Sequence, residues 1–407
     1  MKTKKFPVPD LKIFLLILVI FTGLSAEAQD ILLSYQRSFV RANLADKASI
    51  LEDAATDERA PEFIRVLYEY ALDFAINNAA MLGNDPDMIA VAVEAARGLG
   101  KNGNGASAEL LWNLFASYHD RLTRTEAMKS LGLLAGGNAR VIDNINHFLM
   151  EQTRLYRSSK SFEAGTELDA AAIQASIETL GVLGSISSFA PLFEALNAGY
   201  PLVITGKAQD AIDSLQENIK SQLLDIIKNG LPSEKLSAFR LVSGRSSLSD
   251  TEQGELAEAA LNAGLSAMPG SAEEETALST LRYEAVPVLT RLQWAGASPA
   301  AIRHFYRVQA DYQNGAAPQE RFLEAISCLS VMGTPEAVQA LVLQLGSLNS
   351  HIERDGEYDE AVALAVIKAL GTIGDKSAFD YLLYISYLSY SEQVQTAARE
   401  ALNQLRW

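Results

Sequence analysis

A short pattern of small residues and leucine recurs along this chain and constrains its fold more than any other feature. An alanine-rich stretch ends in Leu-Gly, a second glycine follows within a few residues, and another amphipathic stretch comes next. The pattern is clearest at 365–375 and recurs at 94–100, 127–136, 175–184 and 325–333, where serine replaces the first glycine. Such repetition predicts stacked structural units, each of which shields the apolar face of its neighbour.

Each residue type in the pattern has a packing role. Alanine lets neighbouring helices approach closely, and leucine fills the space between helix layers. The first glycine removes a side chain where the next repeat packs, and the second suits the left-handed residue that ends a helix. Apolar residues at helical spacing then follow, as in 189–196 and 337–345. The pattern therefore predicts an all-α fold, an α-α superhelix of helical hairpins.

The spacing of the copies fits helix pairs. Leu99 and Leu131 are 32 residues apart, and Leu329 and Leu370 are 41 apart, against roughly 30–45 residues for a helix pair. Five copies are expected, at 90–117, 125–152, 170–198, 321–346 and 361–390, with divergent copies within 205–315. The pattern resembles HEAT repeats, most closely the short HEAT-like type of phycobilin lyases and many bacterial scaffold proteins. The resemblance implies a HEAT-like or armadillo-type solenoid.

The two ends of the chain depart from the repeat. Residues 31–80 look helical without matching it, and Pro61 is expected to open a helix. We expect 29–85 to form an N-terminal helical cap that is continuous with a repeat solenoid over 86–407. Val394 to Trp407 is expected to form one closing helix, and loops are expected near 312–319 and 347–360.

Helix ends are marked by capping sequences. Gly333-Thr334-Pro335-Glu336 supplies a stop, an N-cap, a proline for the first turn and an acid beside it. The stretches 83–86 and 296–299 repeat this logic, and 249–252 matches a capping box.

The N-terminus is typical of an export signal. Four lysines (Lys2, Lys4, Lys5, Lys12) flank an apolar run that ends at Leu24, and Ala26-Glu27-Ala28 supplies a signal-peptidase pattern. The apolar run is shorter than the roughly 20 residues of a membrane span. We expect residues 1–28 to be a signal peptide that is cleaved, so that the exported protein begins at Gln29. The periplasm is the expected location, with a secreted or an inner-membrane-anchored form as alternatives.

Charge and cysteine content exclude several classes of function. The net charge is −16. The first 28 residues carry four lysines and two acids, so their removal makes it −18. An acidic surface repels phosphate backbones, so nucleic acid is not an expected partner. Cys328 is the one cysteine, which leaves no disulfide framework and favours a buried core residue over a reactive thiol.

Motifs for catalysis, metals or cofactors are missing from the sequence. The four histidines are isolated from one another, and no metal-binding, nucleophile-elbow or phosphate-loop motif occurs. Residues 98–103 match G-x-G-x-x-G but follow a predicted helix, so a repeat turn is favoured over a dinucleotide site. The acids of 355–360 favour a solvated loop over a calcium site. We expect no enzyme activity, no cofactor and no metal.

Two constellations are candidate partner-binding sites. Tyr381, Tyr384, Tyr387 and Tyr390 are spaced by three and are predicted to form an aromatic stripe along one helix. The alternative is that these rings pack between repeats. Arg303 and Arg307 are predicted to share one helical face as a local basic patch. Pairing with neighbouring acids within the chain is the alternative.

These features together predict a non-enzymatic scaffold or adaptor of the cell envelope. It would bind a protein or peptide partner through the concave face made by the second helix of each repeat. One alternative is a lyase-like or chaperone-like protein that acts on a cofactor or a client protein. Another is an envelope-anchored structural protein whose N-terminal segment is not cleaved.

Overall fold

The structure is a computed structural model that describes residues 26–56, 61–162, 168–242, 245 and 247–406. These residues form α-helices joined by turns and short 3₁₀ segments, with no strand among them. The predicted all-α class is confirmed. The expected signal peptide, 1–28, lies outside the described residues except for its last three, which begin the first described helix.

The chain divides into two compact units, Met1–Glu217 and Asn218–Trp407, called here unit 1 and unit 2. Both are built from consecutive helices that pair as hairpins. The cap expected over 29–85 belongs to unit 1, where its helices pack directly against the first predicted repeat.

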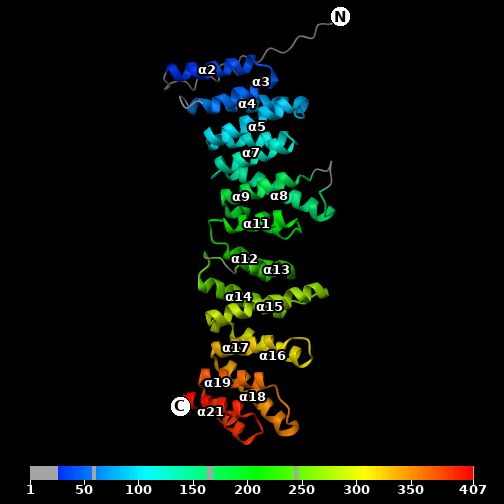
Figure 1. Ribbon diagram of the computed structural model, residues 1–407, viewed down its shortest axis with the longest axis vertical. Helices are drawn as coiled ribbons and strands as arrows, with labels where there is room; N and C mark the ends of the chain where they lie inside the picture. Colours follow the sequence, from blue (N-terminus) through cyan, green and yellow to red (C-terminus); the bar gives the residue numbers. More distant parts are fainter. Residues whose placement is uncertain (1–25, 57–60, 163–167, 243–244, 246, 407) are drawn as a thin grey trace. The chain divides into compact units, whose positions relative to one another are not determined.

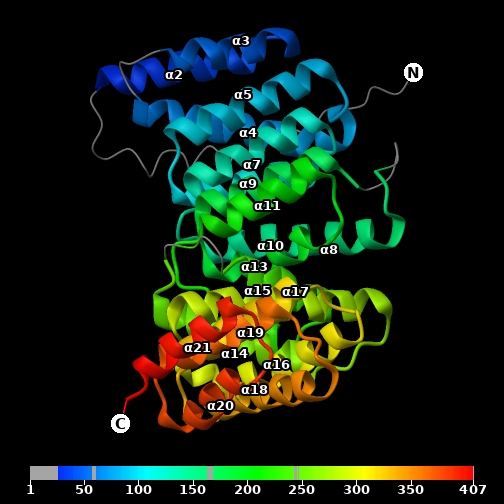
Figure 2. The ribbon, with the colours of Figure 1, turned by 60° about the horizontal axis from the view of Figure 1, so that its bottom comes forward.

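Unit 1 is a stack of two helix layers. The helices are α2 (Ala26–Arg41), α3 (Leu44–Ala55), α4 (Pro61–Leu82), α5 (Pro86–Asn102), α6 (Ala108–Ser117), α7 (Arg121–Leu134), α8 (Ala139–Ser159), α9 (Ala170–Leu183), α10 (Phe189–Leu196) and α11 (Leu202–Asp213), with 3₁₀ turns η1 (Gly105–Ser107) and η2 (Ile186–Ser188). Each helix packs on the one two places before it, so the odd-numbered helices form one layer and the even-numbered helices the other. Figure 2 shows α7, α9 and α11 following one another in the odd layer.

Unit 2 has the same two-layer order. Its helices are α12 (Lys220–Asn229), α13 (Pro232–Arg240), α14 (Asp250–Ser266), α15 (Ala272–Leu292), α16 (Ser298–Gln313), α17 (Gln319–Met332), α18 (Pro335–Asp355), α19 (Glu360–Ile373), α20 (Phe379–Tyr384) and α21 (Glu392–Gln404), with 3₁₀ turns η3 (Ala295–Ala297), η4 (Lys376–Ala378) and η5 (Ile385–Tyr387). The odd layer runs from α13 to α21 and the even layer from α12 to α20. The labels of Figure 1 let the reader follow this alternation through α16, α17, α18 and α19.

The predicted repeats correspond to helix pairs. Each of the five expected copies contains two successive helices: α5–α6, α7–α8, α9–α10, α17–α18 and α19–α20. A helical repeat solenoid is therefore confirmed. The prediction of a loop over 347–360 is wrong for most of that range, because α18 continues to Asp355. The helix ends at Gly356, whose φ is 72°. Leu341, Leu345 and Ile352 are buried along the same side of α18, which keeps this segment helical.

The glycine of the Leu-Gly pattern lies where two helices of the odd layer approach most closely. A Cβ on Gly100 would lie 2.6 Å from the Ser130 hydroxyl oxygen, and one on Gly181 would lie 2.9 Å from the Cα of Ala211. At Gly371 the corresponding distance, to the Cβ of Ala401, is again 2.9 Å. These contacts confirm the predicted role of the first glycine at Gly100, Gly181 and Gly371, but not at Gly132, whose Cβ would lie 3.7 Å from the nearest atom.

Two buried hydroxyl groups repeat the same register between successive helices of the odd layer. The Ser130 hydroxyl on α7 donates to the Ala96 carbonyl of α5 over 2.9 Å. The Thr179 hydroxyl on α9 donates to the Met128 carbonyl of α7 over 2.8 Å. Each acceptor lies four residues before the Leu-Gly glycine of its helix, so the two hydrogen bonds occupy equivalent positions in successive repeats.

The predicted capping residues mostly act as expected. Asp85 accepts from the amide of Asp87, and Thr334 accepts from that of Ala337. Ser249 and Glu252 form a capping box. Ser298 is the exception, because its hydroxyl is hydrogen-bonded to the hydroxyl of Thr334, 2.6 Å away, and α16 begins without a side-chain cap.

Two helical glycines of unit 1 should respond oppositely to alanine. Gly181→Ala places a Cβ against the backbone of Ala211, and we expect a net loss of about 1–2 kcal/mol in the free energy of unfolding. Gly206→Ala is the matched control: Gly206 lies in α11 with nothing within 4 Å of its Cβ position, so better helix propensity should stabilise by about 0.5–1 kcal/mol. Urea unfolding followed by circular dichroism measures both, and equal effects would contradict the packing role of Gly181.

Candidate functional site

The four tyrosines predicted to share one helix do not do so. α20 ends at Tyr384, the 3₁₀ turn η5 ends at Tyr387, and Leu388 is extended with φ −109° and ψ 164°. The exposed fractions of Tyr381, Tyr384 and Tyr387 are 37%, 40% and 75%, but that of Tyr390 is 5%. We call the exposed three the tyrosine row. Tyr390 is excluded from it because the extended Leu388 turns the chain inward.

Tyr390 instead belongs to the core of unit 2. Its hydroxyl donates to Asn349 Oδ1 over 3.0 Å, and its ring meets Tyr358 edge-on at 4.8 Å. Burial raises the pKa of Tyr390. For this residue the alternative of a ring packed between repeats is the correct one.

The tyrosine row is attached to α18. Tyr381 lies against Gly346, where a Cβ would come within 3.0 Å of the ring, and its carbonyl accepts from Asn349 Nδ2 over 3.1 Å. The Tyr384 hydroxyl donates to Glu353 Oε1 over 3.2 Å, and this bond raises the pKa of Tyr384. Tyr381 and Tyr384 are therefore each held against α18.

The basic patch predicted around Arg303 and Arg307 is paired within the chain. Arg303 Nη2 donates to Asn262 Oδ1 over 2.6 Å. Arg307 pairs with Glu275 at 3.5 Å and with Asp311 at 3.3 Å. Both side chains lie on α16, as expected. The contacts of Arg307 match the alternative of pairing with neighbouring acids, whereas Arg303 binds a neutral amide.

Two residues whose side chains could take part in catalysis, His304 and Cys328, are deeply buried. His304 is 2% exposed, and burial, together with Arg282 and Arg321, lowers its pKa to about 3. Burial raises the pKa of the Cys328 thiol to about 11, which matches the expected core residue. Neither group is available in the charged form that acid–base or thiol chemistry would use near neutral pH.

The described part of the chain offers little else for chemistry. No cluster of three His, Cys, Asp or Glu side chains there could hold a metal ion. No helix within the same residues combines the length and apolar character of a membrane span. Gly98 and Gly100, which form the G-x-G of 98–103, lie inside α5 and pack against Tyr68 and Ser130.

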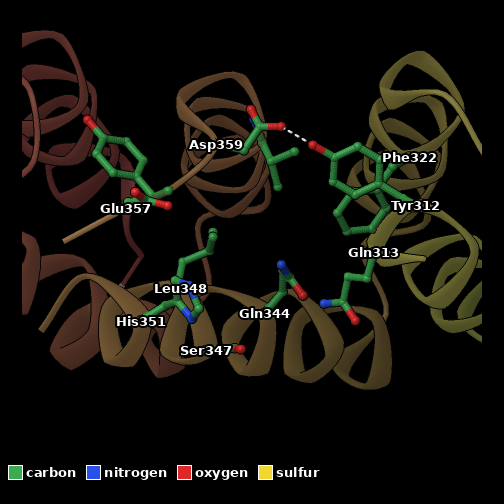
Figure 3. A pocket seen from close by; sticks show the side chains of 11 residues that line it. Tyr312, Gln313, Phe322, Gln344, Ser347, Leu348, His351, Glu357 and Asp359 are labelled. Carbon is green, nitrogen blue, oxygen red and sulfur yellow. Dashed lines mark hydrogen bonds between the residues drawn. The ribbon is translucent and has the colours of Figure 1, made fainter. Parts of the chain in front are cut away.

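A pocket of about 580 Å³ in unit 2 was not predicted from the sequence. It opens between the hairpins α16–α17 and α18–α19, as Figure 3 shows. Its lining comes from all four of these helices and from the turn between α18 and α19, and consists of Tyr312, Gln313, Phe322, Gln344, Ser347, Leu348, His351, Glu357, Tyr358, Asp359 and Val362. The acidic stretch 355–360 was the only signal for it in the sequence.

Asp359 is the most constrained polar group of the pocket. Its Oδ1 caps α19 by accepting from the Val362 amide over 3.2 Å, and its Oδ2 accepts from the Tyr312 hydroxyl and from Gln319 Nε2, the latter over 2.6 Å. Burial raises its pKa, but these hydrogen bonds outweigh burial and hold the pKa below its usual range. Asp359 is therefore a fixed negative charge near neutral pH.

An aromatic wall and a buried amide complete the pocket. Tyr312 stacks on the buried Phe322 with ring centroids 5.5 Å apart and an angle of 24°. Gln344 is 6% exposed and points from α18 toward Tyr312 and Asp359 (Figure 3). Its Oε1 accepts from Gln309 Nε2 over 2.5 Å, which orients the amide and leaves its Nε2 without a partner among the described residues.

Comparison with known proteins does not assign this chain to a family. No protein-family model matches the chain, and no curated protein matches it either. Among solved structures, an engineered protein aligns over 89% of this chain and 99% of its own, at 17% identity and a TM-score of 0.31. A chain from a structure concerned with the interaction between cadherin and beta-catenin aligns over 98% of this chain and 99% of its own, at 14% identity and a TM-score of 0.29. Neither superposition is close, and the helical architecture rests on this chain's own packing.

The charge on Asp359 should make a measurable contribution to stability. Asp359→Asn keeps a helix-capping oxygen but loses the charge-assisted bonds from Tyr312 and Gln319, so we expect the free energy of unfolding to fall by about 1 kcal/mol near pH 7. Because the folded pKa of Asp359 is lowered, its contribution is complete above the unfolded value of about 3.9 and is lost as pH falls through the folded pKa.

Urea unfolding of both proteins across this pH range measures the difference. A gap between wild type and variant that stayed constant below about pH 3 would contradict a charge effect.

Proposed function

We propose that this protein is an exported, non-enzymatic scaffold of HEAT type that binds a protein partner through the even helix layer of unit 2. The observation that carries the proposal is an asymmetry of exposed apolar side chains in that unit. Within its described helices, every large apolar side chain classed as exposed lies in the even layer or in η5, namely Tyr306, Leu343, Tyr381, Leu383, Tyr384 and Tyr387.

This distribution is typical of a binding face. Isolated exposed apolar residues need no explanation, but aromatic side chains that gather on one layer mark an interaction surface. Leu343 lies one helical turn before Gly346, against which Tyr381 packs, and Glu353 holds Tyr384 two turns further along α18. Leu343, Tyr381 and Tyr384 thus follow one another along α18. Tyrosine is also a frequent anchor residue at interfaces.

The HEAT assignment and the cellular location are supported by the sequence. The Leu-Gly repeat with its second, left-handed glycine, as at Gly184 and Gly374, is the feature that resembles short HEAT-like repeats. The lysine-flanked apolar run and Ala26-Glu27-Ala28 support export, with the periplasm as the proposed location. The scaffold role is in keeping with a chain whose histidines and cysteine form no reactive cluster among the described residues.

Removing the outer rings of the tyrosine row should weaken partner binding. With Tyr384 and Tyr387 both changed to alanine, we expect capture of the partner from the native envelope fraction to fall at least roughly tenfold, because buried tyrosines at interfaces often act as hot spots. Met268→Ala is the matched control, since Met268 is an exposed apolar residue of unit 2 in the loop before α15. Partners are compared by quantitative mass spectrometry, and equal capture by wild type and double variant would remove the row as a binding site.

Export makes a separate prediction. Protein purified from its native host should begin at Gln29, as measured by intact mass. A mass that retains residues 1–28 would instead support the anchored alternative. An absorbance spectrum of the same sample tests the cofactor-handling alternative, which would be favoured by visible bands.

A further inference from the structure

We propose that the pocket between α16–α17 and α18–α19 binds an arginine side chain of a partner polypeptide. The inference rests on the proposed scaffold function and names the chemistry that one of its sites recognises. Three features of the pocket lining carry it: two carboxylates with no lysine or arginine beside them, an aromatic wall, and the amide donor of Gln344.

The charge of the lining selects a cation. Glu357 and Asp359 contribute two carboxylates, and no lysine or arginine is among the residues that line the pocket. The hydrogen bonds to Asp359 lower its pKa and keep it ionised. Glu357 is exposed at the rim, where a carboxylate keeps its affinity for a partner's cation. An anionic ligand would meet repulsion from both groups.

The aromatic wall favours arginine over lysine. Tyr312 is half-buried, stacked on Phe322, and tethered through its hydroxyl to Asp359. A planar guanidinium can stack on such a ring and donate to a carboxylate beside it at the same time, whereas an ammonium group is a compact and strongly hydrated point charge. The wall and the carboxylate come from opposite hairpins, as Figure 3 shows.

The side chain of Gln344 indicates that the ligand includes a hydrogen-bond acceptor such as a peptide carbonyl. Its side chain is 6% exposed, and Gln309 fixes its Oε1 as an acceptor, so the Nε2 donor points into the pocket without a partner among the described residues. A fixed donor that faces the pocket is free to bind an acceptor of a ligand. A main-chain carbonyl of an extended segment is such an acceptor, and the volume of about 580 Å³ leaves room for main chain beside one guanidinium.

Short peptides test the inference directly. The probe is the end-capped peptide acetyl-Gly-Gly-Arg-Gly-Gly-amide, whose one charge is the guanidinium. The matched peptide carries citrulline, a neutral isostere, and a third carries lysine. Saturation-transfer difference NMR on the purified full chain measures a dissociation constant for each. We expect saturable binding of the arginine peptide, with the citrulline and lysine peptides at least roughly threefold weaker.

Two variants locate the site. Glu357→Gln should weaken the arginine peptide roughly threefold and reduce its salt dependence, because it removes an exposed charge pair. Glu336→Gln makes the same chemical change in the first turn of α18, eight residues before Gln344 and outside the pocket lining, and should leave binding unchanged. Gln344→Met keeps side-chain volume but removes the amide donor, and should weaken arginine and citrulline peptides by the same factor. Urea unfolding checks that each variant folds.

The outcomes separate this inference from the scaffold proposal. No saturable binding of the arginine peptide, equal binding of all three peptides, or equal losses in the Glu357 and Glu336 variants would each overturn the arginine site. The assay uses no natural partner and no residue of the tyrosine row. Loss of the tyrosine row as a binding face would therefore leave a positive peptide result intact.

Discussion

The close approach of successive helices in the odd layer is the constraint on which each unit depends. Gly181 faces Ala211 and Gly371 faces Ala401 at distances that leave no room for a Cβ. At Gly100 a Cβ would likewise lie 2.6 Å from the Ser130 hydroxyl, and this hydroxyl donates to the Ala96 carbonyl of the preceding helix, so there packing and buried hydrogen bonding share one register. A larger residue at the glycine would push the helices apart, and both kinds of contact would be lost together.

Because contacts within the odd layer set the spacing between repeats, the helices of the even layer can vary in length. They range from the six residues of α20 to the 22 of α4. The long α18 carries Gln344 and His351 of the pocket, and the turn after it brings Glu357 and Asp359 back toward Tyr312 at the end of α16. The exposed apolar side chains of the unit 2 helices also lie in the even layer. The regular layer thus provides rigidity, and the irregular layer provides surfaces for binding.

The features that could be predicted from the sequence are those that depend on residues close together in the chain. The repeat positions, the left-handed glycines such as Gly333, and the caps at Asp85 and Ser249 depend on neighbouring residues alone, and the sequence predicts them correctly. The break after Tyr387 depends on distant contacts: no glycine or proline marks it, and the burial of Tyr390 beside Asn349 stabilises it. The pocket could not be predicted for the same reason, since its lining comes from two hairpins and only the acidic stretch 355–360 lies together in the sequence.

The tyrosine row and the pocket are linked by one side chain. Asn349 donates to the carbonyl of Tyr381 in the row and accepts from the hydroxyl of Tyr390, whose ring packs against Tyr358 of the pocket lining. Tyr358 in turn accepts from the amide of Ser391, which begins α21. Asn349, Tyr390, Tyr358 and Ser391 are buried or half-buried, so these hydrogen bonds fix the position of α20 and of the pocket wall on the same part of α18.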